Sequence, residues 1–352
     1  MSPYISVLLP VYNGGKTLKN AIMSIQNQTF TDWELLILNE FGSDDGSAEI
    51  ASAFSESDRR IKLLQNTEQL GLAKTLNHGI RVAKGQLIAR IDADDIAYPK
   101  RFKKQIDFLQ KNPSVGICGT WQKHVSSTGC WIHKTPRDHE TLAISLMFSC
   151  EMCHSTIMMR KSVLLKNDLF YDSEYEAEDF ELWSRAISVT YLSNIPEVLG
   201  EYSYGNNISD KKMMLLKKEH GKICAKTMNR TLDVDFDQKQ QELLNAWENI
   251  FLSEVNHRNR KGKLLTFKKM LMDLDDANQR IKMFDSYKFR GVLRARWAWA
   301  NWNIRIEPRR IATIDGVFSP IHFHKLIRLN QMLKTVHSPK MLLKKIMERL
   351  AR

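Results

Sequence analysis

Residues 87–95 read LIARIDADD and join a short apolar run to three aspartates. The apolar run, residues 87–91, is typical of a buried strand. Side chains two apart in an extended chain point the same way, so Asp92 and Asp94 would direct two carboxylates toward one point. Crowded carboxylates repel one another unless a cation lies between them. Their oxygen atoms suit Mg²⁺ or Mn²⁺, which would in turn neutralise a bound diphosphate.

The same letters also have a plainer interpretation. The triplet could be a solvated acidic turn, or Asp95 could cap a helix over residues 96–109. Asp-x-Asp triplets are common, so the triplet alone favours the plainer interpretation, and the surrounding sequence has to decide.

Upstream of this stretch, strand and helix signals alternate about every 30 residues. Apolar runs predict buried strands, and segments with helical spacing or glycine boundaries predict helices between them; the strands are residues 5–10, 35–38, 61–64 and 87–91, and the helices residues 16–27, 48–54 and 71–83. This pattern predicts an α/β fold with a mainly parallel central sheet covered on both faces. Ligands bind outside the carboxyl ends of such strands, so the loops after Pro10, Leu38 and Ile91 should meet at one edge.

The second part of the chain has a different character. The pattern becomes less regular after Arg101 and mostly helical after Asp210, so we expect a catalytic domain over residues 1–210 and a helical basic region over residues 211–352. Residues 211–352 hold 31 Lys and Arg against 14 Asp and Glu, a net charge of +17, whereas residues 1–210 carry −5. The basic region would suit an anionic partner, either a membrane surface, a lipid-linked phosphate or a nucleic acid.

Cysteine usage and hydropathy indicate a compartment. The chain has five cysteines, which is an odd number, and it is too large to need disulfide bonds for stability. Both facts predict reduced thiols. Cys150 and Cys153 form a lone C-x-x-C pair, which we interpret as structural thiols. No signal peptide and no apolar stretch of about 18 residues is present, so we expect a cytoplasmic protein.

Five motifs occur in order along the first 210 residues. They are ISVLLPVYN at residues 5–13, NEFGSDDGS at 39–47, GLAKTLNHG at 71–79, ARIDADDIAYP at 89–99 and YDSEYEAEDFELW at 171–183. Together they resemble the family 2 glycosyltransferases, which have the GT-A fold. The resemblance covers roughly residues 4–210 and is greatest to bacterial enzymes that build lipooligosaccharide, O-antigen or capsule chains.

The resemblance implies roles for the residues that match the first four motifs. The nucleotide sugar would be bound by Pro10, Val11, Tyr12, Asn13, Glu40, Asp92 and Ala93. Asp94 would bind a divalent metal, Mn²⁺ or Mg²⁺, that bridges the two phosphates, and Asp95 could assist. For Pro10 the plainer role, the end of a strand, is preferred.

The second motif departs from the family pattern. The family usually has Asp-Asp-Gly-Ser after the second strand, and its second Asp contacts the base. Here the strand ends in Asn39 and Glu40, so Glu40 is the candidate base contact. The letters DDGS come later, at residues 44–47, where we expect the following turn. A UDP-sugar donor is favoured, and a thymidine donor is the alternative.

The fifth motif supplies the acceptor side of the expected reaction. An inverting transfer needs a base near the acceptor hydroxyl. The resemblance assigns this role to Asp179 beside Glu178, although both acids could simply cap a helix over residues 180–187. Contacts to the acceptor or phosphate are also open for His154, Trp183 and Tyr204. Core packing is preferred for Trp183, and Tyr204 stands where relatives often have histidine.

Two basic stretches lie near the end of the chain. Residues 294–310 interleave tryptophans with arginines, and residues 340–352 form a basic amphipathic helix pattern. This helix could lie on an anionic membrane surface at the inner face of the cytoplasmic membrane, or it could pack on the catalytic domain. A membrane location agrees with a glycan or polyprenyl-diphosphate-linked acceptor. Nucleic acid is the weakest alternative because no recognition motif is present.

Three functions compete on this sequence. The first is an inverting, metal-dependent glycosyltransferase that uses a UDP-sugar and makes a β linkage. The second is a sugar nucleotidyltransferase, whose Gly-rich first loop is only faintly matched by VYNGGK at residues 11–16. The third is a non-catalytic glycan- or membrane-binding subunit; Asp92, Asp94 and Asp179 argue against it, whereas Glu40 and Tyr204 favour it.

Overall fold

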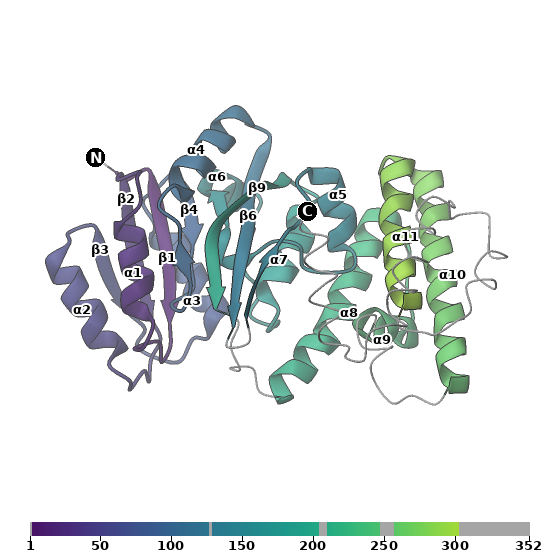
Figure 1. Cartoon of the computed structure of the whole chain (residues 1–352), viewed down its shortest axis with the longest axis horizontal. Helices are drawn as coiled ribbons and strands as arrows, with labels where there is room; N and C mark the ends of the chain where they lie inside the picture. The colour runs from purple at the N-terminus through teal and green to yellow at the C-terminus, as the bar shows by residue number, and fades with distance from the viewer. Residues whose placement is uncertain (1, 127–128, 204–209, 247–256, 303–352) are drawn as a thin grey trace.

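The computed structural model describes residues 2–126, 129–203, 210–246 and 257–302. Figure 1 shows a central twisted sheet with helices on both faces and a group of helices at one end. The sheet has nine strands in the order β3-β2-β1-β4-β8-β6-β9-β5, with β7 paired to β6. The α/β fold predicted from the sequence is therefore confirmed.

The first quarter of the chain forms the parallel half of the sheet. Its elements are β1 (Ile5–Val11), α1 (Leu18–Gln26), β2 (Trp33–Asn39), α2 (Ser47–Ser57), β3 (Ile61–Gln65), α3 (Leu72–Val82) and β4 (Leu87–Arg90). Strand β1 pairs in parallel with β2 and β4, and β2 pairs in parallel with β3. These are the strands that the apolar runs predicted, because each run is bounded by turn residues and followed by helical spacing.

The next hundred residues add antiparallel strands. Their elements are β5 (Ile96–Ala97), α4 (Arg101–Lys111), β6 (Val115–Ser126), β7 (Gly129–His133), α5 (His139–Leu146), the 3₁₀ turn η1 (His154–Thr156), β8 (Met158–Arg160), α6 (Lys161–Lys166), α7 (Glu178–Ala186) and β9 (Tyr191–Ser203). Strand β8 runs antiparallel between β4 and β6, whereas β6 and β9 are parallel. The sheet thus continues past β4 with mixed directions, which explains the less regular pattern after Arg101.

Two apolar cores lie on opposite faces of the sheet. In β1, Val7 and Leu9 belong to the core that α1 and α4 cover, whereas Leu8 belongs to the core that α3 covers. All seven residues of β1 are buried, as expected for a strand covered on both sides. Burial on both faces is why the run at residues 5–10 is apolar without alternation.

The helices beyond residue 210 share a core with the sheet. They are α8 (Asp210–Leu232), α9 (Gln238–Ala246), α10 (His257–Ile281) and α11 (Ser286–Trp302). Phe148 and Trp183 belong to the same apolar cluster as Phe267 of α10 and Leu293 of α11. The predicted boundary near residue 210 coincides with the start of α8, but one core crosses it. Whether the two regions act as separate domains stays a prediction.

Most of the predicted membrane features lie outside the described residues. Trp297 is 7% exposed and packs in the shared core, so this tryptophan is an internal residue. The side chains of Trp299 and Trp302 and the whole of residues 340–352 lie outside the described residues. No helix in the described part of the chain has the length and apolar character needed to cross a bilayer.

Candidate active site

The site lies at the carboxyl ends of β1 and β4. The chain passes from β1 to β2 and β3 on one side and then returns to β4 on the other, so β1 and β4 border a topological switch point. Loops that leave two such strands diverge and open a crevice in which ligands bind. Figure 1 shows the ends of both strands at the same edge of the sheet.

The three predicted loops do meet at this edge. The α-carbon of Gly14, after β1, lies so near Ala93, after β4, that an added Cβ would come within 3.2 Å of the Ala93 Cβ. The backbone N–H of Gly15 donates to the Asp45 carboxylate at 2.7 Å. Contacts therefore join the loops after β1, β2 and β4.

Four residues of the first loop were predicted to line the nucleotide pocket. Pro10 and Val11 lie within β1 and are buried, which agrees with the strand-end role preferred for Pro10. Tyr12 is 54% exposed, and Asn13 is exposed with a left-handed φ of 51°. The Asn13 side-chain oxygen accepts the N–H of Asp44 at 3.1 Å. Tyr12 and Asn13 are therefore the members of this set that have surface toward solvent, and the pocket role of all four stays a prediction.

The candidate base contact, Glu40, is engaged inside the protein. Its carboxylate is buried at 7% exposure and accepts five hydrogen bonds, from the N–H groups of Phe41, Leu70 and Gly71, the Asn66 amide and the Thr75 hydroxyl. Burial alone would raise the pKa of Glu40, but these bonds, led by Asn66, lower it below the ordinary value. Glu40 ties the end of β2 to the start of α3, and contact with a base stays a prediction.

The displaced DDGS letters occupy a turn, as expected. Gly46 has a left-handed φ of 85° and precedes α2, which begins at Ser47. The Asp45 carboxylate accepts the Ser47 N–H at 3.2 Å and the Gly15 N–H at 2.7 Å. Asp45 thus holds the first loop against the second.

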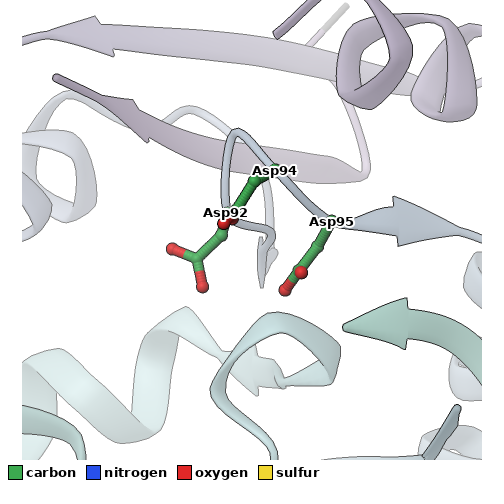
Figure 2. Close-up of side chains that lie close together, drawn as sticks. All are labelled: Asp92, Asp94 and Asp95. Atoms are coloured by element: carbon green, nitrogen blue, oxygen red, sulfur yellow. The ribbon is translucent and has the colours of Figure 1, made fainter. Parts of the chain in front are cut away.

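The three aspartates after β4 form one acidic cluster. Carboxylate oxygens of Asp92, Asp94 and Asp95 all lie within 4.8 Å of one another (Figure 2). Burial, together with the charge of Asp92, raises the pKa of Asp94 above its ordinary value. The same causes raise the pKa of Asp95 to about 7. The crowding expected from the sequence is therefore present.

Asp95 is not a helix cap. It is followed by the short strand β5, and the next helix, α4, begins only at Arg101. One carboxylate oxygen of Asp95 accepts the Ser203 N–H at 2.8 Å, and the other has no hydrogen-bond partner among the described residues. A buried carboxylate oxygen without a donor, beside two further carboxylates, fits a divalent cation, which prefers oxygen ligands and would relieve the repulsion.

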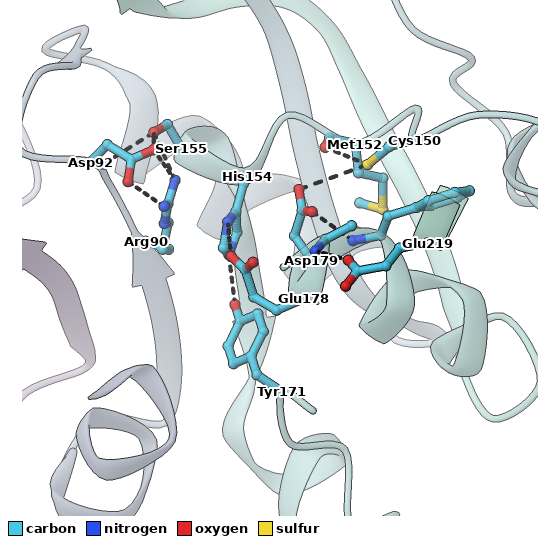
Figure 3. A network of polar contacts seen from close by, with 12 residues as sticks. Arg90, Asp92, Cys150, Met152, His154, Ser155, Tyr171, Glu178, Asp179 and Glu219 are labelled. Atoms are coloured by element: carbon cyan, nitrogen blue, oxygen red, sulfur yellow. Dashed lines mark hydrogen bonds and ion pairs between the residues drawn. The ribbon is translucent and has the colours of Figure 1, made fainter. Parts of the chain in front are cut away.

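Asp92 is held by two residues that the sequence analysis did not identify. The buried guanidinium of Arg90 forms a two-fold ion pair with the Asp92 carboxylate. The Ser155 hydroxyl donates to the same carboxylate at 2.8 Å and accepts from Arg90 at 3.0 Å (Figure 3). Arg90 stands two positions before Asp92 in an otherwise apolar run. A charged residue in a buried strand needs a partner, and this was the sequence signal that could have predicted the Arg90–Asp92 pair.

The second carboxylate pair begins α7 on the other side of η1. Burial and then the Asp179 charge raise the pKa of Glu178 to about 8, and burial raises the pKa of Asp179 as well. His154 lies between this pair and Tyr171, with its Nε2 2.9 Å from the Tyr171 hydroxyl and its Nδ1 3.8 Å from Glu178 (Figure 3). Burial and Arg90 hold the pKa of His154 well below its ordinary value, so the ring is neutral.

The backbone that presents Asp179 is held from two directions. Glu219 of α8 accepts the N–H groups of Glu176 and Ala177 at 2.8 and 3.0 Å, just before α7. The Cys150 thiol lies 3.8 Å from the Asp179 carboxylate. Cys150 is a free cysteine, and burial raises the pKa of its thiol, which agrees with the structural role expected for it. Asp179 therefore has a fixed position next to an un-ionised thiol.

The remaining predicted contacts have different outcomes. Trp183 is fully buried in the shared core, so it has the packing role that was preferred and offers no surface to a sugar. His154 is buried behind Glu178 and contacts Tyr171 rather than the loops after β1 and β4. Tyr204 lies outside the described residues.

The turn η1 connects the two halves of the site. Ser155 binds Asp92 of the acidic cluster, and the preceding residue, His154, faces Glu178 at the start of α7. The acidic cluster and the Glu178–Asp179 pair thus lie on either side of one short turn (Figure 3). The first suits a diphosphate leaving group and the second suits proton removal from a hydroxyl.

Solved structures with the same fold define the class. The chain superimposes on S. aureus TarS 1–349 in complex with UDP-GlcNAc with a TM-score of 0.59 and 16% sequence identity, covering 89% of this chain and 92% of TarS 1–349. This likeness concerns the fold alone. The chain therefore has the GT-A fold.

The family follows from sequence relatives. The family model described as glycosyl transferase family 2 matches residues 6–168. The O-antigen biosynthesis glycosyltransferase WbnJ of Escherichia coli is 31% identical over 216 residues, 60% of this chain and 83% of WbnJ. An uncharacterized glycosyltransferase of Haemophilus influenzae is 29% identical over 287 residues, 78% of this chain and 87% of the relative. The chain belongs to glycosyltransferase family 2 and is an enzyme of that class.

Proposed function

We propose that this enzyme transfers a sugar, with inversion, from a UDP-sugar to a glycan or polyprenyl-diphosphate-linked glycan during bacterial surface polysaccharide synthesis. The donor class is supported by the likeness to TarS, which was solved with UDP-GlcNAc, and the pathway by the likeness to WbnJ, which is named for O-antigen biosynthesis. The observation that carries the proposal is the placement of η1 between the acidic cluster and Glu178.

On the donor side, the crevice between β1 and β4 would receive the nucleotide. Tyr12 and Asn13 would border the base and ribose, and Asp92 and Ala93 would contact the nucleotide sugar. Asp94 would hold Mn²⁺ or Mg²⁺, a group that supplies charge neutralisation for the departing nucleoside diphosphate. Arg90 and Ser155 already bind the Asp92 carboxylate. Of Asp92 and Asp94, it is therefore Asp94 that is available for the cation.

On the acceptor side, Asp179 would take the proton from the attacking hydroxyl. A carboxylate with a raised pKa is a stronger base than an exposed one, and the pKa of Asp179 is raised by burial. Glu178, with a pKa of about 8, is mostly protonated at neutral pH. The negative charge of Asp179 is one of the causes of this raised pKa of Glu178, which supports the base role of Asp179.

The basic C-terminal region would hold the enzyme at the inner face of the cytoplasmic membrane. The net charge of +17 over residues 211–352 is complementary to anionic lipid, and a polyprenyl-diphosphate acceptor would be bound at the same surface.

Calorimetric titration with UDP, TDP, GDP and CDP, each with and without Mn²⁺, tests the donor side. We expect Mn²⁺-dependent binding of UDP that the Asp94→Ala variant loses and the Asp107→Ala variant keeps, since Asp107 pairs with Lys103 on α4 away from the crevice. Binding of no diphosphate would favour a non-catalytic subunit. Tighter binding of UTP than of UDP in a parallel titration would favour a nucleotidyltransferase.

A further inference from the structure

Aromatic rings form a continuous row across three neighbouring strands. His124 of β6 stands opposite Trp131 of β7 and in register with Tyr202 of β9. Its ring centroid lies 5.2 Å from that of Trp131, 4.9 Å from that of Tyr202 and 5.0 Å from that of His133. Residues that oppose one another across strands share a face of the sheet, so these four rings, the ring platform, lie on one side.

The two faces of this hairpin differ in chemistry. Gln122 opposes His133 on the platform side, and its amide nitrogen is buried with no hydrogen-bond partner in the described part of the chain. On the other side, Lys123 pairs with Glu201 at 3.2 Å, and Ile132, opposite Lys123, is 46% exposed. Aromatic and amide groups are therefore gathered on one face and charges on the other.

The ring platform adjoins the acidic cluster. The N–H of Ser203, next to Tyr202, donates to Asp95 at 2.8 Å. Burial and then the charges of Asp95, Asp92 and Asp94 raise the pKa of Tyr202 to about 12, so the phenol lies within their electrostatic reach.

The inner end of the platform is also tied to the turn beside the catalytic carboxylates. Thr120 of β6, on the platform side of Gln122, donates its N–H to Thr156 of η1 at 3.1 Å. Figure 1 shows the ends of β6 and β9 at the same edge of the sheet as the end of β1. The row of rings thus starts at the wall of the active site and runs outward to β7.

We propose that the ring platform is a carbohydrate-binding site that holds the sugar chain of the acceptor beside the acidic cluster. The inference rests on the proposed function, because a glycosyltransferase must hold an acceptor next to its donor. The occupant is a neutral glycan segment, bound through the rings of Trp131, His124, His133 and Tyr202.

The chemistry of the platform matches a sugar ring. Pyranose rings present C–H groups on one face, which pack against aromatic faces, and hydroxyls at the rim, which need donors and acceptors. Burial and the neighbouring His133 lower the pKa of His124 to about 4, so its ring is neutral. With His124 and Tyr202 un-ionised at neutral pH, the surface suits polyhydroxyl groups better than phosphates.

Saturation-transfer NMR on the full chain tests this site. The probes are methyl glycosides of glucose, galactose, mannose, N-acetylglucosamine and N-acetylgalactosamine, each measured with and without saturating UDP and Mn²⁺. We expect saturation of the ring C–H protons of at least one glycoside in the presence of UDP. The Trp131→Ala variant should bind it about three- to ten-fold more weakly, and Trp131→Phe should keep most of the affinity.

The Ile132→Ala variant is the matched control, because Ile132 is the exposed neighbour on the opposite face of β7. It should bind the glycoside as the wild type does. The platform is refuted if no glycoside receives saturation, or if Ile132→Ala loses as much affinity as Trp131→Ala. A protein that binds no nucleotide but still shows Trp131-dependent glycoside binding would refute the proposed function and leave the platform standing.

Discussion

Replacing Glu178 with glutamine should remove a pH-dependent loss of stability. Burial and the Asp179 charge raise the pKa of Glu178 from 4.5 to about 8 in the folded protein. The folded state therefore binds this proton more tightly than the unfolded state, and stability falls as the pH rises from 4.5 to 8. Glutamine has nearly the shape of the protonated acid and cannot ionise, so the variant lacks this loss.

The magnitude follows from the two pKa values. Between pH 5 and pH 9 the ionisation of Glu178 costs about 4 kcal/mol of folding free energy. The unfolding entropy of 352 residues is about 0.7 kcal/mol/K, so the melting temperature of the variant minus that of the wild type should increase by about 5 °C over this range. Asp179 is the exception, because its charge is one of the causes that raise the pKa of Glu178; the other titrating groups are the same in both proteins and largely cancel in the difference.

Differential scanning fluorimetry at pH 5, 6, 7, 8 and 9 measures this difference. Glu174→Gln is the matched control, because Glu174 is exposed in the loop before α7, and its melting temperature should follow that of the wild type at every pH. A Glu178→Gln difference that stays constant across the range would show that Glu178 is not held in its protonated form, and the assignment of the negative charge to Asp179 would lose its basis.

Three further predictions concern the site and its surroundings. Asp179→Asn should lower transfer of radiolabelled sugar from a UDP-sugar to extracted polyprenyl-diphosphate glycans by about 10²–10⁴-fold with UDP affinity unchanged; retained turnover would exclude Asp179 as the base. Arg90→Met should destabilise the protein by about 3–5 kcal/mol in urea denaturation, because it removes the guanidinium that pairs with Asp92 beside the other two aspartates. The matched variant Lys103→Met, at an exposed ion pair, should cost about 0–1 kcal/mol. Deletion of residues 340–352 should reduce sedimentation with anionic liposomes, and unchanged sedimentation would show that this segment packs internally.

Local sequence rules were sufficient to predict that the loops after β1, β2 and β4 meet at one edge of the sheet. The runs at residues 5–10 and 87–91 are apolar, each ends in turn-forming letters, and helical spacing follows. Parallel strands bring such turns to one edge whatever their distance along the chain. The contacts of Gly14 with Ala93 and of Gly15 with Asp45 were therefore predictable as a meeting of loops, although not as individual bonds.

The residues that were missed depend on partners far along the chain. Ser155 meets Asp92 from 63 positions away, through a turn that no periodicity signals. Four of the five donors to Glu40 come from residues 66–75. The resemblance suggested that Glu40 contacts a base, whereas in the structure its carboxylate is bound by donors inside the protein.

The ring platform illustrates the same limit for strands. His124 and Tyr202 are neighbours only because of the register between β6 and β9, and that register shifts twice between Thr120 and Lys123. Strand pairing with such irregularities cannot be read from alternation of residue types alone.

The apolar cluster that α8, α10 and α11 share with α5 and α7 limits how this enzyme can be re-engineered. Chimeras that exchange the C-terminal region between relatives would place new side chains against Phe148 and Trp183, which are fully buried. A successful exchange has to carry the matching faces of α5 and α7 as well, although α7 also bears Glu178 and Asp179. Variation in the helical region is thereby linked to the position of Glu178 and Asp179, and an exchanged C-terminal region will need compensating substitutions in α5 and α7.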